Sequence, residues 1–177
     1  MTISTRIAAF ADLPVLQQLI SASVRGLSKG YYTERQIQSS LVYIFGVDTR
    51  LLEDGTYYVA EAGGEIVACG GWSKRNTLFG GDQYKEDADP FLDPARDAAR
   101  IRAFFVHPDW ARKGIGRMMI DLCETAAREN GFTRLELAAT LPGQPLYAAL
   151  GYSGSTVSHV PMQDGEYLPI IRMYKEL

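Results

Sequence analysis

The stretch Phe104–Arg117, FFVHPDWARKGIGR, constrains the fold of this chain more than any other segment. The apolar run Ile101–Val106 predicts a buried strand, which must end before Pro108 because proline cannot donate to a sheet ladder. From Gly114 to Asn130 apolar residues recur at helical spacing, which predicts an amphipathic helix. Arg134–Ala139 then has the composition of a second strand. A strand, a helix and a strand in succession predict two parallel strands with a crossover helix, and hence an α/β fold.

Further elements are expected on both sides of this unit. One helix should begin after Asp12, a typical N-cap, and another after Thr33, which starts a T-x-x-Q capping box. The pair Gly63–Gly64 allows the positive φ angles of a tight turn and predicts a hairpin. Pro169 must stand at the start of the last strand, because a central strand cannot lose a ladder donor. The other predicted segments are strands at Arg6–Ala9, Thr56–Ala60, Glu65–Cys69 and Ile170–Tyr174, and a short helix at Pro145–Leu150.

Length and charge narrow the class of protein. The 177 residues contain no repeat or linker, so one domain over residues 1–177 is expected. A net charge of −3 argues against a nucleic-acid partner, since phosphate binding needs a basic excess. Neither a signal peptide nor an apolar run near the ~20 residues of a membrane span is present, so no membrane partner is expected. Cys69 and Cys123 stand alone at no metal-ligand spacing, which predicts reduced core residues, a cytoplasmic protein and no metal.

The polar segment at residues 73–99 has no pattern of a helix or strand. It contains Gly80–Gly81, Pro90, Pro94 and six acidic residues. A connection of this length is usually functional or mobile, and a solvated surface loop is the alternative interpretation.

The start of the helix at Gly114 has the chemistry of an anion site. The first turn of a helix presents unpaired N–H groups and the positive end of the helix dipole. Gly114 and Gly116 remove side chains where a phosphate would approach the backbone, and Arg112, Lys113 and Arg117 add positive charge. The spacing matches neither a Walker loop nor the G-x-G-x-x-G of dinucleotide folds. The segment therefore predicts a diphosphate cradle of another kind.

Two motifs resemble those of the GNAT N-acetyltransferase superfamily. Val106-x-Pro108 followed by Ala111–Gly116 is similar to motif A, a strand ending V-x-P and then Q/R-x-x-G-x-G/A. Ala111 departs from the Gln or Arg usual at its position, which should weaken cofactor binding without abolishing it. Leu146–Tyr152 resembles the family's L/F-Y-x-x-x-G-F/Y segment. The resemblance implies a mixed, strongly twisted sheet of about six to seven strands flanked by about four helices, with a V-shaped split between two parallel strands.

The resemblance also implies acetyl-CoA as co-substrate and a set of residues around it. Backbone groups of the first splayed strand would bond the pantetheine arm, and the glycine-containing loop would hold the diphosphate. Tyr147 matches the tyrosine that protonates the departing sulfur. Thr140 occupies the place of an asparagine near the end of the second splayed strand. The implied cofactor-binding residues are Phe104, Phe105, Val106, Arg112, Lys113, Gly114, Ile115, Gly116, Arg117 and Thr140.

The implied reaction is transfer of the acetyl group to a primary amine by direct attack in a ternary complex. The N–H of Val106 is our candidate for holding the oxyanion. No acid is available on the strand, where Arg102, Phe104 and Val106 are expected on one face and Ile101, Ala103 and Phe105 on the other. The candidates that remain for the base are an ordered water and three side chains, Glu61, Glu136 and His107.

The acceptor is left open as a small-molecule or peptide amine. One hypothesis is that acids of the 73–99 segment attract a cationic amine to a site with walls of Tyr31, Tyr32, Trp72 and Phe79. The alternatives are a non-catalytic acetyl-CoA sensor or interaction module of the same fold, and a nucleotide-phosphate binder. Edge strands of this fold often meet another copy, which makes a homodimer a further expectation.

Overall fold

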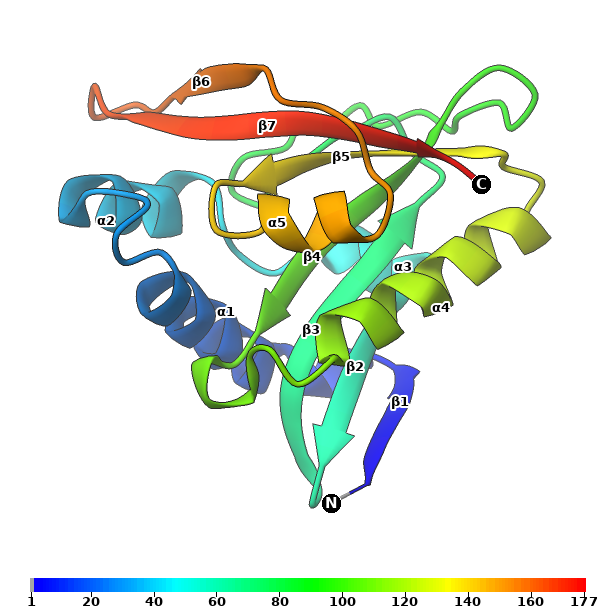
Figure 1. Ribbon diagram of the computed structural model, residues 1–177, viewed down its shortest axis with the longest axis horizontal. Helices are drawn as coiled ribbons and strands as arrows, with labels where there is room; N and C mark the ends of the chain where they lie inside the picture. Colours follow the sequence, from blue (N-terminus) through cyan, green and yellow to red (C-terminus); the bar gives the residue numbers. More distant parts are fainter. Residues whose placement is uncertain (1) are drawn as a thin grey trace.

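The computed structural model describes residues 2–177, which form a mixed seven-stranded sheet with helices on both faces (Figure 1). The strand order is β1-β2-β3-β4-β5-β7-β6, with β4 and β5 parallel and the other neighbours antiparallel. The strands are β1 (Ile3–Ile7), β2 (Tyr57–Ala62), β3 (Glu65–Ser73), β4 (Ala99–Val106), β5 (Arg134–Thr140), β6 (Val157–Pro161) and β7 (Tyr167–Glu176). The α-helices are α1 (Leu13–Leu27), α2 (Glu34–Tyr43), α3 (Thr49–Glu53), α4 (Ile115–Glu129) and α5 (Gln144–Ala149), with short 3-10 turns η1 (Phe10–Asp12) and η2 (Pro108–Trp110).

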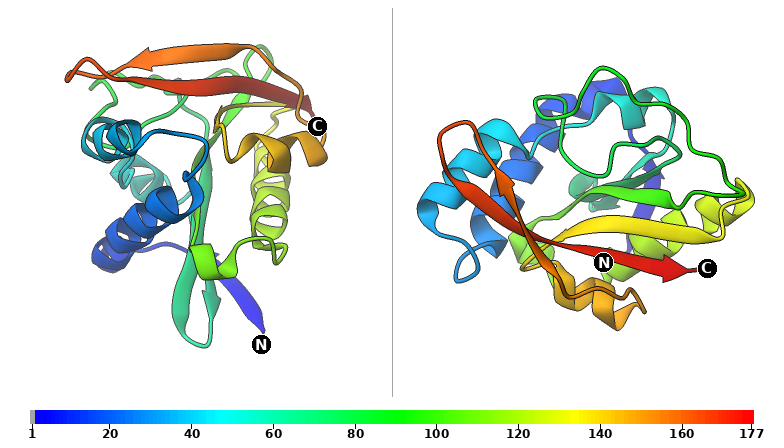
Figure 2. Two further views of the ribbon diagram at one scale, coloured as in Figure 1. Left: turned by 60° about the vertical axis from the view of Figure 1, so that its left-hand side comes forward. Right: turned by 90° about the horizontal axis from the view of Figure 1, so that it is seen from above.

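The two faces of the sheet carry separate apolar cores. Helices α1 and α2 lie on one face and α4 and α5 on the other (Figure 2). Leu16 and Ile20 of α1 pack with Leu51 of α3 on the first face. Ile120 and Cys123 of α4 belong to the core of the second face. Burial of one such aliphatic side chain contributes about 1.5–3 kcal/mol, so the two cores fix the helices firmly on the sheet.

The parallel pair β4–β5 is joined at one end and split at the other. Ala99 pairs with Leu135 and Arg100 with Glu136, and beyond these residues the two strands diverge (Figure 1). The mixed, open sheet and the split predicted from the family resemblance are confirmed.

A β-bulge interrupts β4 just where the strands begin to diverge. Pairing with β3 passes from Gly71–Arg102 to Cys69–Phe105, so β4 has one residue more than β3 in this interval. Ala103 has φ 53, a left-handed conformation that is rare for a residue with a side chain. The predicted alternation of β4 side chains is therefore wrong before the bulge. Ile101 packs in the core under α4, whereas Arg102 reaches toward α3, because an inserted residue exchanges the two faces of a strand.

Every helix and strand predicted from the sequence is present, and several short ones were not predicted. The additional elements are α3, β6, η1 and η2. Pro169 is the third residue of β7 rather than its first. It precedes Ile170, where the pairing of β7 with β5 begins, and faces His159 of β6. The physical reason for the prediction still holds, since the missing N–H lies where β7 has its β6 neighbour alone.

The connection between β3 and β4 is long and irregular, as predicted, but it is anchored. A bridge joins Arg75 to Phe91, and the amide of Asn76 donates to the carbonyl of Pro90 at 3.0 Å. The amide of Gly81 donates to the carbonyl of Ile44 at 2.8 Å, just beyond α2. The first two contacts join the two arms of residues 74–98 to each other, and the third joins the segment to the chain after α2.

Candidate functional site

A cavity of about 720 Å³ follows the split between β4 and β5. Its walls come from the second half of α1, the connections that follow α2 and β3, the split strands, the start of α4, and α5. Of the residues predicted for the site, those that line it are Phe104, Phe105, Val106, Arg112, Gly114, Gly116, Arg117, Thr140 and Tyr147. Segments that lie far apart in the sequence therefore line one continuous cavity.

One end of the cavity is the predicted anion cradle. Gly114 is the N-cap of α4 with φ 83, and Arg112 has φ 60, so two left-handed residues turn the chain into the helix. The first N–H groups of α4 and the side chains of Arg112 and Arg117 lie at this end. Two predicted residues do not line the cavity. Lys113 places its ammonium 4.7 Å from the Trp110 ring centroid, and the Ile115 side chain is buried in the core.

Gly116 has a role that the sequence did not indicate. A Cβ atom at this position would lie 2.8 Å from Cδ2 of Leu146 in α5. At Gly114 a Cβ would meet nothing within 4 Å, so glycine is required there by its φ angle alone. Gly116 therefore allows α4 and α5 to pack closely, and Gly114 allows the chain to turn into α4. Both glycines also leave the backbone accessible.

Backbone and hydroxyl groups of the split strands form the middle of the cavity. The His107 N–H donates to the carbonyl of Val67 on β3 at 2.9 Å. Because N–H groups alternate along a strand, the N–H of Val106 points the other way, into the split. On β5, the Thr140 hydroxyl accepts a hydrogen bond from the N–H of Gly143 at 3.2 Å, so it also fixes the turn that leads into α5.

Tyr147 of α5 lines the cavity. It is 8% exposed, and its ring meets that of Tyr152 edge to face at 5.8 Å. Burial raises the pKa of Tyr147 above its ordinary value of 10.0, so the phenol stays protonated at neutral pH. Cys69 and Cys123 are both buried outside the cavity lining, and burial raises the pKa of Cys69 to about 12. A protonated phenol is thus present in the cavity, and the buried thiols lack the character of nucleophiles.

Among residues 2–177, no Asp or Glu side chain lines the cavity. The three side chains considered as bases are engaged elsewhere. Glu61 pairs with Arg6 at 2.9 Å, and Glu136 pairs with Arg100 at 2.8 Å. His107 accepts a hydrogen bond at Nδ1 from the N–H of Asp109 at 3.2 Å. None of the three side chains lines the cavity.

A buried ionic cluster supports the cavity wall beside β4. Arg102 donates to Asp48 at 2.7 Å, to the carbonyl of Thr77 at 3.0 Å and to the carbonyl of Gly80 at 2.6 Å. Asp48 also pairs with Lys85 and caps α3 through the N–H of Arg50. Desolvation by burial lowers the pKa of Arg102, and the charge of Asp48 opposes that shift. This cluster ties the α2–α3 connection and the β3–β4 connection to the split strand.

The aromatic residues expected around an acceptor divide into two groups. Tyr31 and Phe79 line the cavity, as predicted. Tyr32 and Trp72 do not, because both are structural. The Tyr32 hydroxyl donates to the carbonyl of Pro169 at 2.6 Å, and Trp72, 2% exposed, packs in the core under α4. Residues of α1 and of the α2–α3 connection also line the cavity and were not predicted, because their sequence carries no recognised signal. They are Ser23, Val24, Gly26, Leu27, Phe45 and Gly46.

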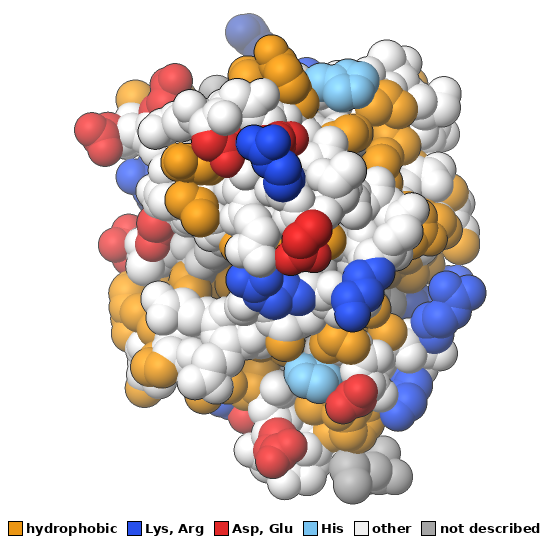
Figure 3. All heavy atoms as spheres, turned by 90° about the vertical axis from the view of Figure 1, so that its left-hand side faces the viewer, with side chains coloured by type: hydrophobic (Ala, Val, Ile, Leu, Met, Phe, Trp, Pro, Cys, Tyr) orange, Lys and Arg blue, Asp and Glu red, His pale blue; other side chains and the backbone are white. Residues whose placement is uncertain are grey.

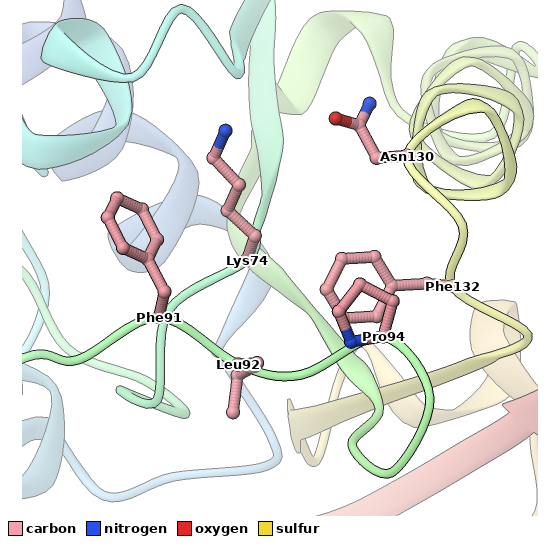
Figure 4. A pocket seen from close by; sticks show the side chains of 6 residues that line it. All are labelled: Lys74, Phe91, Leu92, Pro94, Asn130 and Phe132. Atoms are coloured by element: carbon pink, nitrogen blue, oxygen red, sulfur yellow. The ribbon is translucent and has the colours of Figure 1, made fainter.

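A second, smaller hollow lies where the β3–β4 connection meets the end of α4. Its volume is about 220 Å³, and Figure 4 shows Phe91 and Lys74 on one side of it and Asn130 and Phe132 on the other. Phe91 is 63% exposed and has the Arg75 guanidinium 4.2 Å from its ring centroid. This hollow shares no lining residue with the large cavity in the described part of the chain.

The surface charges, the possible metal ligands and the apolar character of the helices are further features that bear on function. On the face formed by α1 and α2, acidic and basic side chains are interspersed with hydrophobic ones (Figure 3). Within residues 2–177, no three His, Cys, Asp or Glu side chains gather as metal ligands. In the same range no helix has the length and apolar character needed to cross a membrane.

Comparisons with known proteins agree on a family. A sequence model of the Acetyltransferase (GNAT) family matches residues 22–152. A comparison with curated protein sequences finds no match. The matched range includes the cradle, the split strands and α5, and thus all of the residues that line the cavity.

Solved structures share the fold at low sequence identity. A GCN5-related N-acetyltransferase from Rhodopseudomonas palustris has a TM-score of 0.73 and 21% identity, covering 100% of this chain and 97% of that one. The PaiA N-acetyltransferase of Thermoplasma acidophilum, in complex with coenzyme A, has a TM-score of 0.66 and 15% identity, covering 100% of both chains. A phosphinothricin acetyltransferase from Sinorhizobium meliloti, in complex with acetyl-CoA, has a TM-score of 0.65 and 19% identity, covering 100% and 89%. At these identities the likeness concerns the fold.

Proposed function

The chain belongs to the acetyltransferase (GNAT) family, and from that premise we propose that it moves the acetyl group of acetyl-CoA to a primary amine. The observation that carries the proposal is the cavity, which joins an anion cradle, a split pair of strands and a protonated phenol in one space. Two structures of the same fold contain coenzyme A or acetyl-CoA, which supports this choice of co-substrate. We propose one catalytic domain spanning residues 1–177.

The cradle is the proposed site of the diphosphate. The N–H groups at the start of α4 would bind its oxygens, and Arg112 and Arg117 would supply positive charge. Lys113 would act over a longer range, from its position beside Trp110. The pantetheine arm is proposed to lie in the split, along the backbone of Phe104–Val106 and beside Thr140. Acetyl-CoA supplies the activated acyl group, and the chain supplies binding and polarity.

The proposed reaction is a direct transfer in a ternary complex. The amine nitrogen bonds to the acetyl carbon and the carbon–sulfur bond breaks. The Val106 N–H stabilises the negative charge that develops on the acyl oxygen. The hydroxyl of Tyr147 gives its proton to the departing sulfur, and water carries the amine proton to solvent, since no carboxylate among the described residues lines the cavity.

Two observations support proposals for the compartment and the assembly. The two cysteines are free and buried, which suits a reducing compartment such as the cytoplasm. Strands β1 and β6 form the two edges of the sheet, and pairing of an edge with a second copy would give a homodimer.

Thermal unfolding with and without ligand tests the co-substrate. Acetyl-CoA at a hundred times its dissociation constant should add about 2.7 kcal/mol to stability. For a chain of this size that is a rise in Tm of roughly 5–11 °C. CoA should give a similar rise, and ADP and NAD a small one. If saturating acetyl-CoA leaves Tm unchanged, the proposed function is wrong.

Replacement of Tyr147 by phenylalanine tests for turnover. The variant keeps the ring in place and loses the acidic proton, so kcat should fall about 10²–10⁴-fold while the affinity for acetyl-CoA stays the same. Tyr174→Phe, on the exposed side of β7, is the matched control and should keep full activity. Binding of acetyl-CoA without turnover by the unmodified protein, over a broad panel of amines, would favour a non-catalytic sensor instead.

A further inference from the structure

The part of the cavity wall that comes from α1 and from the connections after α1, α2 and β3 has mainly apolar and aromatic side chains. The co-substrate proposal does not use this part of the wall. Its apolar side chains are Val24, Leu27, Tyr31, Phe45, Leu78 and Phe79. Phe45 meets Phe105 of β4 edge to face at 5.9 Å, and Phe79 stacks on Tyr84 at 5.1 Å. Rings held in this way present fixed apolar surfaces to the space between them.

The acidic residues next to this wall do not line the cavity, and two of them have structural partners. Asp82 follows the lining residue Gly81, but its carboxylate accepts from the N–H of Thr49 at 3.1 Å and pairs with Lys85 at 2.9 Å. Asp89 is buried, accepts from the N–H of Thr77 at 2.7 Å and pairs with Arg50 at 3.3 Å. Glu86 and Asp87 are exposed and do not line the cavity. None of these carboxylates therefore touches a group inside the cavity, and the hypothesis that the acids of the 73–99 segment attract a cationic acceptor stays a prediction.

The charged side chains that do line the cavity are the three arginines Arg102, Arg112 and Arg117. Arg102 is 2% exposed and is neutralised by Asp48 at 2.7 Å. An acceptor with several positive charges would enter this space with no carboxylate to pair them, in the part of the chain that the structure describes. Moving an unpaired charge into such a space is costly.

Hydrogen bonds and backbone contacts also hold the wall in place, so it can select an acceptor by its shape. Arg102 holds the carbonyls of Thr77 and Gly80 on either side of Phe79. A Cβ atom added to Gly81 would lie 2.8 Å from the backbone of Gly46, so the two connections touch through their main chains. A pocket of fixed aromatic walls favours a flat apolar group of matching width.

We propose that the acceptor is a monoamine carried on an apolar, aromatic group, an arylalkylamine, with its ring against Phe79 and Phe45. The inference rests on the proposed acetyl transfer and names the substrate class of that same site. The ring would be held by the apolar wall, and the amine, in its neutral form, would reach the acyl carbon beside β4. Polyamines and lysine-rich peptides are excluded by the same lining.

Steady-state acetylation of three amines tests the substrate class. The probes are 2-phenylethylamine, n-propylamine, which lacks the ring, and spermidine, which adds positive charges. We expect kcat/KM for 2-phenylethylamine to exceed that for each of the other two at least tenfold. Phe79→Ala should lower kcat/KM for 2-phenylethylamine about tenfold, or 1.4 kcal/mol, and leave that for n-propylamine nearly unchanged. Phe91→Ala removes an exposed ring of the same connection, beside the separate hollow in Figure 4, and should change neither value.

The outcomes separate this inference from the function on which it rests. A thermal shift with acetyl-CoA, measured on the same preparations, reports the co-substrate site alone. If acetyl-CoA binds and spermidine or n-propylamine is the equal of 2-phenylethylamine, the substrate class is wrong and the function stands. If acetyl-CoA binds and none of the three amines is acetylated, the substrate class is wrong, and the broad panel of amines decides between a transferase and a sensor. An equal loss for both monoamines in Phe79→Ala would also overturn it, because the ring would then not be what Phe79 contacts. A missing shift would overturn the function and this inference together.

Discussion

Replacement of Asp48 by asparagine removes one negative charge from the cluster that supports the cavity wall. The side chains of Asp48 and Arg102 are 1% and 2% exposed, and that of Lys85 is 8% exposed. Asparagine has the same shape and can still cap α3 through the N–H of Arg50. The amide nitrogen of asparagine then takes the place of Oδ2, which accepts from Arg102. The substitution therefore removes both the charge and this hydrogen bond, and leaves Arg102 buried without its counter-ion.

The expected loss of stability is large. Breaking a buried ion pair by neutralising one partner costs about 3–5 kcal/mol, because the other charge remains desolvated. At about 2–4 °C per kcal/mol for a chain of this length, Tm should fall by roughly 6–20 °C. Asp93→Asn is the control, because it makes the same change in an exposed ion pair. Asp93 pairs with Arg96 at 3.8 Å on the surface, so its replacement should change stability by less than about 0.5 kcal/mol.

Urea unfolding of the two variants, with the double variant Asp48→Asn/Arg102→Met, measures these differences. The double variant should recover much of the loss, since an apolar side chain replaces the unpaired charge. Lys85 keeps Asp82 as a partner at 2.9 Å in both variants. A loss below 1 kcal/mol for Asp48→Asn, or no recovery in the double variant, would refute the account of the cluster as a buried charge balance.

Three further substitutions test other parts of the structure. Gly26→Ala should destabilise by about 1–3 kcal/mol in urea unfolding, although alanine favours helices, because its Cβ would overlap the Pro108 ring. Asp12→Asn should cost about 1 kcal/mol at pH 7. Its hydrogen bond with Arg6 lowers the pKa of Asp12 below the usual 3.8, so this stability is present above that pH and is lost as pH falls; unfolding at pH 3 should show a smaller difference. Ala103→Val should destabilise more than Ala103→Gly, because a β-branched residue resists φ 53 and glycine does not; equal thermal stabilities would contradict the strained bulge.

The elements that the sequence predicted are those with local signals. The crossover helix has an apolar stripe and a glycine at each end, and the hairpin has Gly63–Gly64. The missed elements lack such signals. Helix α3 is a single turn set by the cap at Asp48, and β6 is an edge strand whose residues, Val160 apart, are exposed, so neither shows a period.

The site divides in the same way. The cradle around Gly114 could be predicted because its parts are adjacent in sequence. The apolar wall from α1 and from the connections after α1, α2 and β3 could not be predicted, because it is assembled from segments far apart in the chain. Tyr31 and Phe79 are the two residues of this wall that the sequence suggested. The bulge at Ala103 exchanged the faces of Ile101 and Arg102, and β4 itself contains no glycine that would mark it. A prediction that leaves out the bulge places Arg102 on the wrong face of β4 and therefore misses the ionic cluster.

The short parallel junction between β4 and β5 has a consequence for how the protein opens. Antiparallel ladders join β1 through β4 on one side and β5, β7 and β6 on the other, while the junction pairs Ala99 with Leu135 and Arg100 with Glu136. Amide hydrogen exchange proceeds through cooperative units, so the two sides should exchange as two groups with separate opening free energies. A ligand in the split would contact both groups of strands. Its binding at this one place should therefore slow amide hydrogen exchange across the whole sheet.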